Sequence, residues 1–316
     1  MNGSFESGGV RLSRYLTKPG GRSGPLPGLI LCHGFPMGPL DARQSAGTFP
    51  ELVDRIASEV GIAAMTFTFR GCGTSEGDFS LQGWVDDLRA AIEHLIAEVH
   101  PTGITLVGTA TGGSVAVCVA ADDPRVHSVA LLSPRADFDD WAAQPRRFLE
   151  HAREIGAVRT PGFPRHFDEW AREFRRFRPV DAARRFAPRP MLVMHGDDDE
   201  SVPPVDARQL AEAHGAAELR LVHGAGHRLR HDPRAVAVLL GLLGARLSAW
   251  FLPLALFYAV LALLSAWAWL RIGMLERPLE WTKPARLLVL APHEDDCVIS
   301  AGGLGVLNRD RKSTRL

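Results

Sequence analysis

The residues most informative about the fold of this 316-residue chain are L-V-G-T-A-T-G-G, at positions 106–113. An apolar strand at residues 104–107 runs into a turn of small residues, and a helix rich in valine and alanine follows. This order is the setting of the G-x-S-x-G motif, whose sharp turn presents a serine nucleophile. The middle residue here is Ala110, which has a methyl group and no oxygen. The stretch therefore predicts a scaffold without the usual nucleophile.

Short apolar runs alternate with helical patterns on both sides of this turn. We expect strands at residues 29–32, 63–69, 104–107, 126–132, 191–194 and 219–222. We expect helices at residues 49–59, 81–99, 113–121, 204–214 and 233–243. Such alternation predicts an α/β fold in which helices cover both faces of a mostly parallel sheet. Residues 135–189 interrupt the alternation, and we expect a cap of two or three helices there that shapes the pocket.

Composition narrows the classes of protein to consider. The 36 basic and 36 acidic residues cancel, which argues against a nucleic-acid partner. The four cysteines are scattered without a C-x-x-C pair and indicate a reducing compartment. The first thirty residues are polar and rich in glycine, so a cleaved signal peptide is not expected.

Four loop motifs follow the expected strands. They are C-H-G-F-P at residues 32–36, R-G-C-G-T-S-E-G at 70–77, H-G-D-D-D-E-S-V-P at 195–203 and G-A-G-H at 224–227. In this order, together with the turn around Ala110, they resemble the α/β-hydrolase family, in particular its dienelactone-hydrolase-like and serine-aminopeptidase-like branches. The resemblance covers residues 10–243 and implies a first domain at residues 1–245 with the α/β-hydrolase fold.

The resemblance also implies roles for individual residues. Acyl transfer needs a nucleophile, a base, an orienting carboxylate and an oxyanion hole. Ala110 occupies the nucleophile position, Asp199 matches the carboxylate and His227 matches the base. The backbone N–H groups of Phe35 and Thr111 match the two oxyanion-hole donors. No cofactor is implied for this domain, and its expected partner is a small acyl substrate.

The missing oxygen leaves the nucleophile open. The side chains that could replace it are Thr109, Thr111, Ser114 and Cys72. Side chains that flank the turn point away from the nucleophile's direction, and a residue one helical turn downstream is expected inside the helix. Water activated by the histidine–aspartate pair could also act as the nucleophile, or the scaffold could have lost hydrolysis. His33 stands beside a glycine, and we expect it to pack its loop.

Residues 249–270 form an uncharged run of 22 residues with aromatic residues near both ends. This length and these ends predict a membrane-spanning helix within residues 246–271. A buried terminal helix is the alternative, although a globular helix usually keeps one polar face. We therefore expect a single-pass membrane protein with its first domain in the cytoplasm, while the flanking arginines leave the orientation open.

The linker and end of the chain, residues 272–316, carry a second resemblance. The stretch L-L-V-L-A-P-H-E-D-D at residues 287–296 is similar to the start of the PIG-L family of zinc deacetylases. That family acts on N-acetylglucosamine-type substrates. The resemblance implies that His293 and Asp296 are zinc ligands and that Asp295 is the general base. A zinc site needs about three protein ligands, so we expect zinc only in a complete deacetylase domain.

Three functions remain open on the sequence. The family resemblance implies hydrolysis of a small ester, amide or acyl-peptide substrate, compromised at Ala110. The alternative is a non-catalytic, membrane-anchored binding or scaffold domain. A third is a fragment of a bifunctional protein that also contains the deacetylase. Whether the chain is an enzyme, with weak or atypical activity, is left open by the sequence.

Overall fold

The computed structural model describes residues 1–21, 24–45, 47, 49–245, 261 and 263–267. The expected membrane helix at residues 249–270 lies outside the described residues except at 261 and 263–267, and the deacetylase-like segment lies wholly outside them. In the part of the chain that is described, no helix is both long and apolar enough to cross a membrane.

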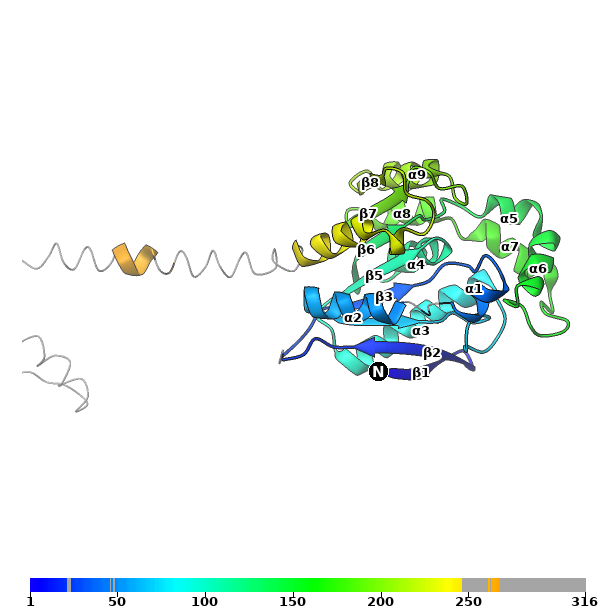
Figure 1. Cartoon of the computed structure of the whole chain (residues 1–316), viewed down its shortest axis with the longest axis horizontal. Coiled ribbons are helices and arrows are strands. Elements are labelled where there is room, and N and C mark those ends of the chain that lie inside the picture. Colours follow the sequence, from blue (N-terminus) through cyan, green and yellow to red (C-terminus); the bar gives the residue numbers. More distant parts are fainter. Residues whose placement is uncertain (22–23, 46, 48, 246–260, 262, 268–316) are drawn as a thin grey trace, which may run out of the picture. The chain divides into compact units, whose positions relative to one another are not determined.

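Eight strands of the described chain form one mixed, mostly parallel sheet in the order β1-β2-β4-β3-β5-β6-β7-β8 (Figure 1). The strands are β1 (Asn2–Ser7), β2 (Val10–Thr17), β3 (Gly28–Cys32), β4 (Ala63–Phe67), β5 (Ile104–Thr109), β6 (Val126–Leu132), β7 (Met191–Gly196) and β8 (Glu218–Val222). β2 pairs antiparallel with β1 and with β4. All the other neighbouring pairs are parallel.

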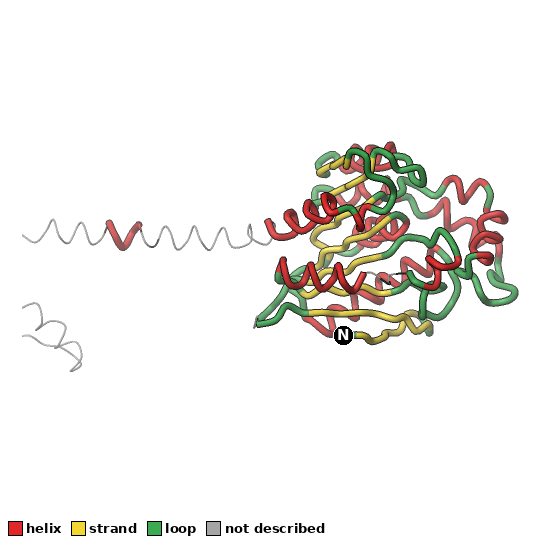
Figure 2. The backbone as a smooth tube through the Cα atoms, viewed as in Figure 1, coloured by secondary structure: helices red, strands yellow, loops and turns green. Residues whose placement is uncertain are grey.

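Helices cover both faces of this sheet (Figure 2). They are α1 (Pro39–Arg43), α2 (Phe49–Val60), α3 (Leu81–Val99), α4 (Thr111–Asp122), α5 (Asp139–Ala143), α6 (Pro145–Glu154), α7 (Phe167–Arg176), α8 (Pro179–Phe186) and α9 (Pro204–His214), followed by helical residues 233–245. One apolar core packs the sheet against α2 and residues 233–245, and a second packs it against α3, α4, α8 and α9. The predicted parallel sheet between two helical layers is thus confirmed.

β3 shows why its sequence is a continuous apolar run. Successive side chains of a strand point to opposite faces. Leu29 and Leu31 accordingly lie in the core beneath α2, whereas Ile30 and Cys32 lie in the core beneath α3 and α4. All five residues of β3 are buried, because both faces of the strand are covered.

The antiparallel hairpin of β1 and β2 was not among the predicted strands. Its residues are only half covered, and the burial alternates along the strands: Phe5, Ser7, Leu12 and Leu16 are buried while their neighbours are more exposed. Because the segment is polar and contains glycine, its apolar residues are too few to mark the strands in the sequence. The two strands therefore add to those expected from the sequence, the first of which was at residues 29–32.

Four helices, α5 to α8, lie between β6 and β7, where two or three were expected. α5 contacts α6 and α7, and α7 reaches α3. α8 instead packs against α4 and α9 through the buried residues Ala182, Ala183 and Phe186. The fourth helix thus belongs to the layer that covers the sheet, which the sequence pattern of the insertion does not reveal.

The strand order reverses at β3, which has β4 on one side and β5 on the other. The loops that leave the carboxyl ends of β3 and β5 therefore start side by side and run in opposite directions. Ligands of open α/β sheets bind in the crevice at such a switch point. This is where the residues of the candidate site meet.

Candidate active site

The turn between β5 and α4 holds Ala110 in a strained backbone conformation. Its φ is 47° and its ψ is −127°, a region that residues with a Cβ rarely adopt. The N–H of Ala110 donates to the carbonyl of Leu132 at 2.8 Å, and its carbonyl accepts from the N–H of Gly113 at 2.9 Å. The sharp turn expected for a nucleophile is therefore present with a methyl group at its tip.

Two glycines make this turn possible. A Cβ at Gly108 would lie 2.5 Å from the Cα of Gly113, and a Cβ at Gly112 would lie 2.1 Å from the carbonyl oxygen of His33. These approaches bring α4 against β5 and bring the turn against the loop that follows β3. The small residues of the motif are thus required by backbone contact.

Asp199 and His227, the predicted carboxylate and base, are hydrogen-bonded to each other. Asp199 Oδ2 lies 2.8 Å from His227 Nδ1, and Asp199 Oδ1 accepts from the N–H groups of Ser201 and Val202, each at 2.9 Å. Burial opposes ionisation of this carboxyl, but hydrogen bonds from His195 and His227 outweigh it and hold the pKa of Asp199 well below its usual range. The structure therefore presents a charged carboxylate to the imidazole.

Neighbouring parallel strands bring these two loops together. Asp199 follows β7 and His227 follows β8, and the strands pair from Leu192 opposite Glu218 to Gly196 opposite Val222. Beyond the strands, the N–H of Asp198 donates to the carbonyl of Ala225 at 3.1 Å. A Cβ at Gly196 would lie 2.0 Å from that same carbonyl, so glycine lets the loops meet.

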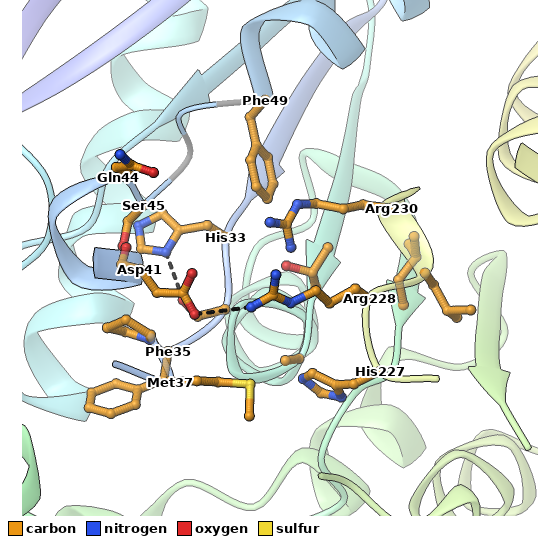
Figure 3. A pocket seen from close by; sticks show the side chains of 16 residues that line it. His33, Phe35, Met37, Asp41, Gln44, Ser45, Phe49, His227, Arg228 and Arg230 are labelled. Carbon is orange, nitrogen blue, oxygen red and sulfur yellow. Dashed lines mark hydrogen bonds and ion pairs between the residues drawn. The ribbon is translucent and has the colours of Figure 1, made fainter. Parts of the chain in front are cut away.

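Ala110 and His227 line one cavity of about 80 Å³ at the carboxyl ends of β3 and β5 (Figure 3). Its other lining residues are His33, Gly34, Phe35, Pro36, Met37, Asp41, Gln44, Ser45, Phe49, Thr109, Leu132, Arg228, Leu229 and Arg230. None of residues 135–189 lines this cavity. The expectation that the cap shapes the pocket is corrected, because the loops after β3 and β8 enclose this cavity.

The predicted oxyanion donors lie at the same place. The N–H groups of Phe35 and Thr111 have no hydrogen-bond acceptor among the described residues. The ring of Phe35 packs against Phe79, Trp141 and Phe148, with centroids 4.7, 5.4 and 5.2 Å away. The cap thus acts on the site by holding the loop that carries one donor.

The candidate replacement nucleophiles differ in their access to this cavity. Ser114 is fully buried, and its hydroxyl donates to the carbonyl of Arg135 at 2.8 Å. Cys72 is also fully buried, and burial raises the pKa of its thiol to about 12. Thr111 does not line the cavity, whereas Thr109 does. The structure therefore brings a single hydroxyl-bearing residue of these four, Thr109, to the cavity wall.

His33 packs its loop, as predicted. Its Nδ1 lies 2.8 Å from the carbonyl oxygen of Gly34, and its Nε2 accepts from the N–H of Phe69 at 3.0 Å. The Trp84 ring meets it edge-on, with centroids 5.4 Å apart. Burial, the largest influence, lowers the pKa of His33 to about 4, so the ring is neutral at pH 7.

The neutral state of His33 predicts a pH dependence of stability. Below an unfolded pKa of about 6.5, the unfolded chain binds a proton that the folded chain excludes until about pH 4. The free energy of unfolding should therefore fall by about 3 kcal/mol, because of this residue, between pH 7 and pH 4. His33→Gln keeps one donor and one acceptor without a titrating group. Urea unfolding at both pH values should show a smaller loss in the free energy of unfolding for the variant than for the native protein. Equal losses would contradict a neutral, buried His33.

The predicted metal residues His293, Asp295 and Asp296 lie outside the described residues. Within the described ranges, no group of three or more histidine, cysteine, aspartate or glutamate side chains is arranged to hold a metal ion.

Two site residues were not singled out on the sequence. His195 is fully buried, and its Nε2 lies 3.1 Å from Asp199 Oδ2 and 2.9 Å from the carbonyl oxygen of Val202. Arg230 lines the cavity three residues after His227. The only sequence signal for His195 was its place in the H-G-x-x-D stretch, and for Arg230 its place in the G-H-x-x-R stretch. Neither pattern shows where the side chain points.

Comparisons with known proteins agree with this geometry. A family model described as "Alpha/beta hydrolase family" matches residues 29–239. An uncharacterized protein of Mycobacterium tuberculosis is 32% identical over 181 residues, which are 55% of this chain and 55% of that protein. This chain spans about half the length of the curated relatives that it matches.

Solved structures show the same fold at low sequence identity. Est1E from Butyrivibrio proteoclasticus, with ferulic acid bound, has a TM-score of 0.58 and 19% identity, covering 78% of this chain and 98% of that one. The Pyrococcus furiosus esterase Pf2001 has a TM-score of 0.57 and 17% identity, covering 79% and 90%. The predicted α/β-hydrolase fold is confirmed, and with the family match over residues 29–239 the chain belongs to the alpha/beta hydrolase family.

Proposed function

We propose that this domain binds a small acyl compound, such as an ester, in an acyl-transfer site that has lost its nucleophile. The observation that carries the proposal is the methyl group of Ala110 at the tip of a strained turn. It lines the same cavity as His227, which is paired with an ionised Asp199. Such a site keeps recognition and loses covalent catalysis.

The hydrogen bond between Asp199 and His227 supports this proposal. The carboxylate accepts at Nδ1 of the imidazole, which leaves Nε2 as the basic nitrogen. Without a hydroxyl at Ala110, the proton that this nitrogen can take comes from water. The two free amides of Phe35 and Thr111 are donors for the oxygen of a bound acyl group. Hydrolysis through water is therefore expected to be weak and binding to dominate.

The comparisons support the substrate class. One structural neighbour is the Pyrococcus furiosus esterase Pf2001, and another, Est1E, has ferulic acid bound, which is consistent with a small acyl compound. In our proposal the domain needs no cofactor, and its cap is formed within residues 135–189. The proposal also keeps residues 249–270 as an anchor that holds the domain at the cytoplasmic side of a membrane, with zinc confined to a longer deacetylase domain.

Binding without turnover tests the proposal. The full chain in detergent solution should bind the neutral diester dimethyl glutarate saturably by calorimetry, and little diester should be consumed. Ala110→Leu fills the cavity and should abolish binding, because a larger side chain occupies the position of the acyl carbon. The matched control Ala216→Leu places the same side chain at an exposed alanine and should bind normally. Absent binding, or unchanged binding in Ala110→Leu, contradicts the proposal.

A further inference from the structure

The guanidinium of Arg230 faces the candidate cavity without an ion-pair or hydrogen-bond partner in the described chain (Figure 3). Arg230 is the middle residue of the 3-10 helix η1 (Leu229–His231). This helix begins two residues after His227. Leu229 is buried at 1% exposure and anchors the turn. The Phe49 ring lies against the guanidinium, with its centroid 5.2 Å from the central carbon. The side chain is thus positioned by packing alone.

The nearby charges leave Arg230 uncompensated. Arg228, the other cavity arginine, is paired with Asp41 at 3.3 Å. His33 is neutral because burial lowers its pKa to about 4. The cavity lining therefore contains two arginines, Arg228 and Arg230, and one carboxylate, Asp41. The positive charge of Arg230 is left without a negative partner.

This arrangement is costly without an anion. The Nε of Arg230 is buried and has no hydrogen-bond partner, and a buried charge is stable only when it is paired. Burial first, and then the positive charge of Arg228, lowers the pKa of Arg230, yet a guanidinium keeps its proton in proteins. The guanidinium N–H groups form a planar fork that matches a carboxylate. The missing partner is therefore expected from the ligand.

We infer that Arg230 binds a carboxylate on the ligand, so that the site takes acyl compounds with a second, free carboxyl group, such as monoesters of short dicarboxylic acids. This rests on the proposed function, because Arg230 shares the cavity with Ala110 and His227. A single unpaired positive charge matches a monovalent carboxylate better than a phosphate dianion. Phe49 holds the fork in place, so little rotamer freedom is lost on binding.

A matched pair of ligands tests this inference, because the native protein cannot form an ester with Ala110. The probes are monomethyl glutarate, which carries one carboxylate, and the neutral dimethyl glutarate. Calorimetry on the full chain should show the anion binding at least about tenfold more tightly, as expected for a charge-assisted hydrogen bond. Arg230→Met keeps the length and the packing on Phe49, and should reduce that preference to about equal affinities.

The control variant is Arg234→Met, which removes an arginine that is bound to Asp232 and lies outside the cavity. It should keep the preference. If Arg230→Met does not fold, Arg230→Gln provides the same comparison. Equal affinities for both probes in the native protein, a preference that survives in the Arg230 variant, or tighter binding of inorganic phosphate than of the monoester each overturns the inference. Binding of the diester without a charge preference would leave the proposed function standing, whereas binding of neither probe removes both.

Discussion

Ala110→Ser is expected to turn this protein into an ester hydrolase that a fluorophosphonate probe labels. The new hydroxyl would stand at the tip of the strained turn, in the cavity that His227 also lines. The imidazole is already oriented by Asp199 at 2.8 Å, so a base is present for the serine proton. Turnover of 4-nitrophenyl acetate should rise by at least about 10²-fold over the native protein, the lower end of what a positioned base contributes.

The double variant Ala110→Ser/His227→Ala provides the control. It keeps the hydroxyl and removes the base, so the gain in hydrolysis and the labelling should both be lost. Strong labelling of the native protein would show that another residue, such as Thr109 at the cavity wall, is the nucleophile. A folded Ala110→Ser protein that is neither labelled nor active would show that the site no longer supports acyl transfer, and would leave binding as its function.

Gly112→Ala is expected to destabilise the domain strongly through a single added methyl group. The new Cβ would lie 2.1 Å from the carbonyl oxygen of His33 and 3.1 Å from that of Cys32, both backbone atoms that cannot rotate away. Either α4 or the end of β3 must move, and we expect a loss of about 3 kcal/mol or more in the free energy of unfolding. Urea unfolding followed by tryptophan fluorescence measures this change.

Gly241→Ala is the matched control for this substitution. Gly241 lies in the helix at residues 233–245, and within the described residues no atom outside the backbone of its own helix lies within 4 Å of the position of its Cβ. Alanine in a helix interior should therefore add about 1 kcal/mol of stability. Similar effects of the two substitutions would mean that the close contact between the turn and the β3 loop is not maintained in solution.

Local patterns were sufficient for the framework of the site. The small-residue turn around Ala110 and the loops of Asp199 and His227 each follow an apolar strand, and parallel strands bring their carboxyl ends to one sheet edge. Their proximity could be inferred because strand ends are marked by composition and the order of the motifs fixes the neighbours. The catalytic roles of these residues stay predictions.

Features that depend on tertiary contact were not available from the sequence. The hairpin at residues 2–17 is half exposed and has a weak alternation of apolar residues. α8 resembles the preceding helices in composition, and only its contacts with α4 and α9 assign it to the layer on the sheet. Arg230 is one of many arginines, and its lack of a partner depends on where Asp41 and Arg228 lie. Pairing of charges is a property of the folded chain.

The site's residues come from both ends of the domain, and this has a consequence during synthesis. Phe35 follows β3, the turn of Ala110 follows β5, and His227 follows β8, the last strand of the described residues. Because a chain emerges from the ribosome with its N-terminus first, a nascent domain can pack β3, β4 and β5 while it still lacks the base. If the cavity binds the proposed ligand, it can do so only after translation has passed β8. Occupancy of the cavity would then distinguish finished domains from stalled or prematurely released ones.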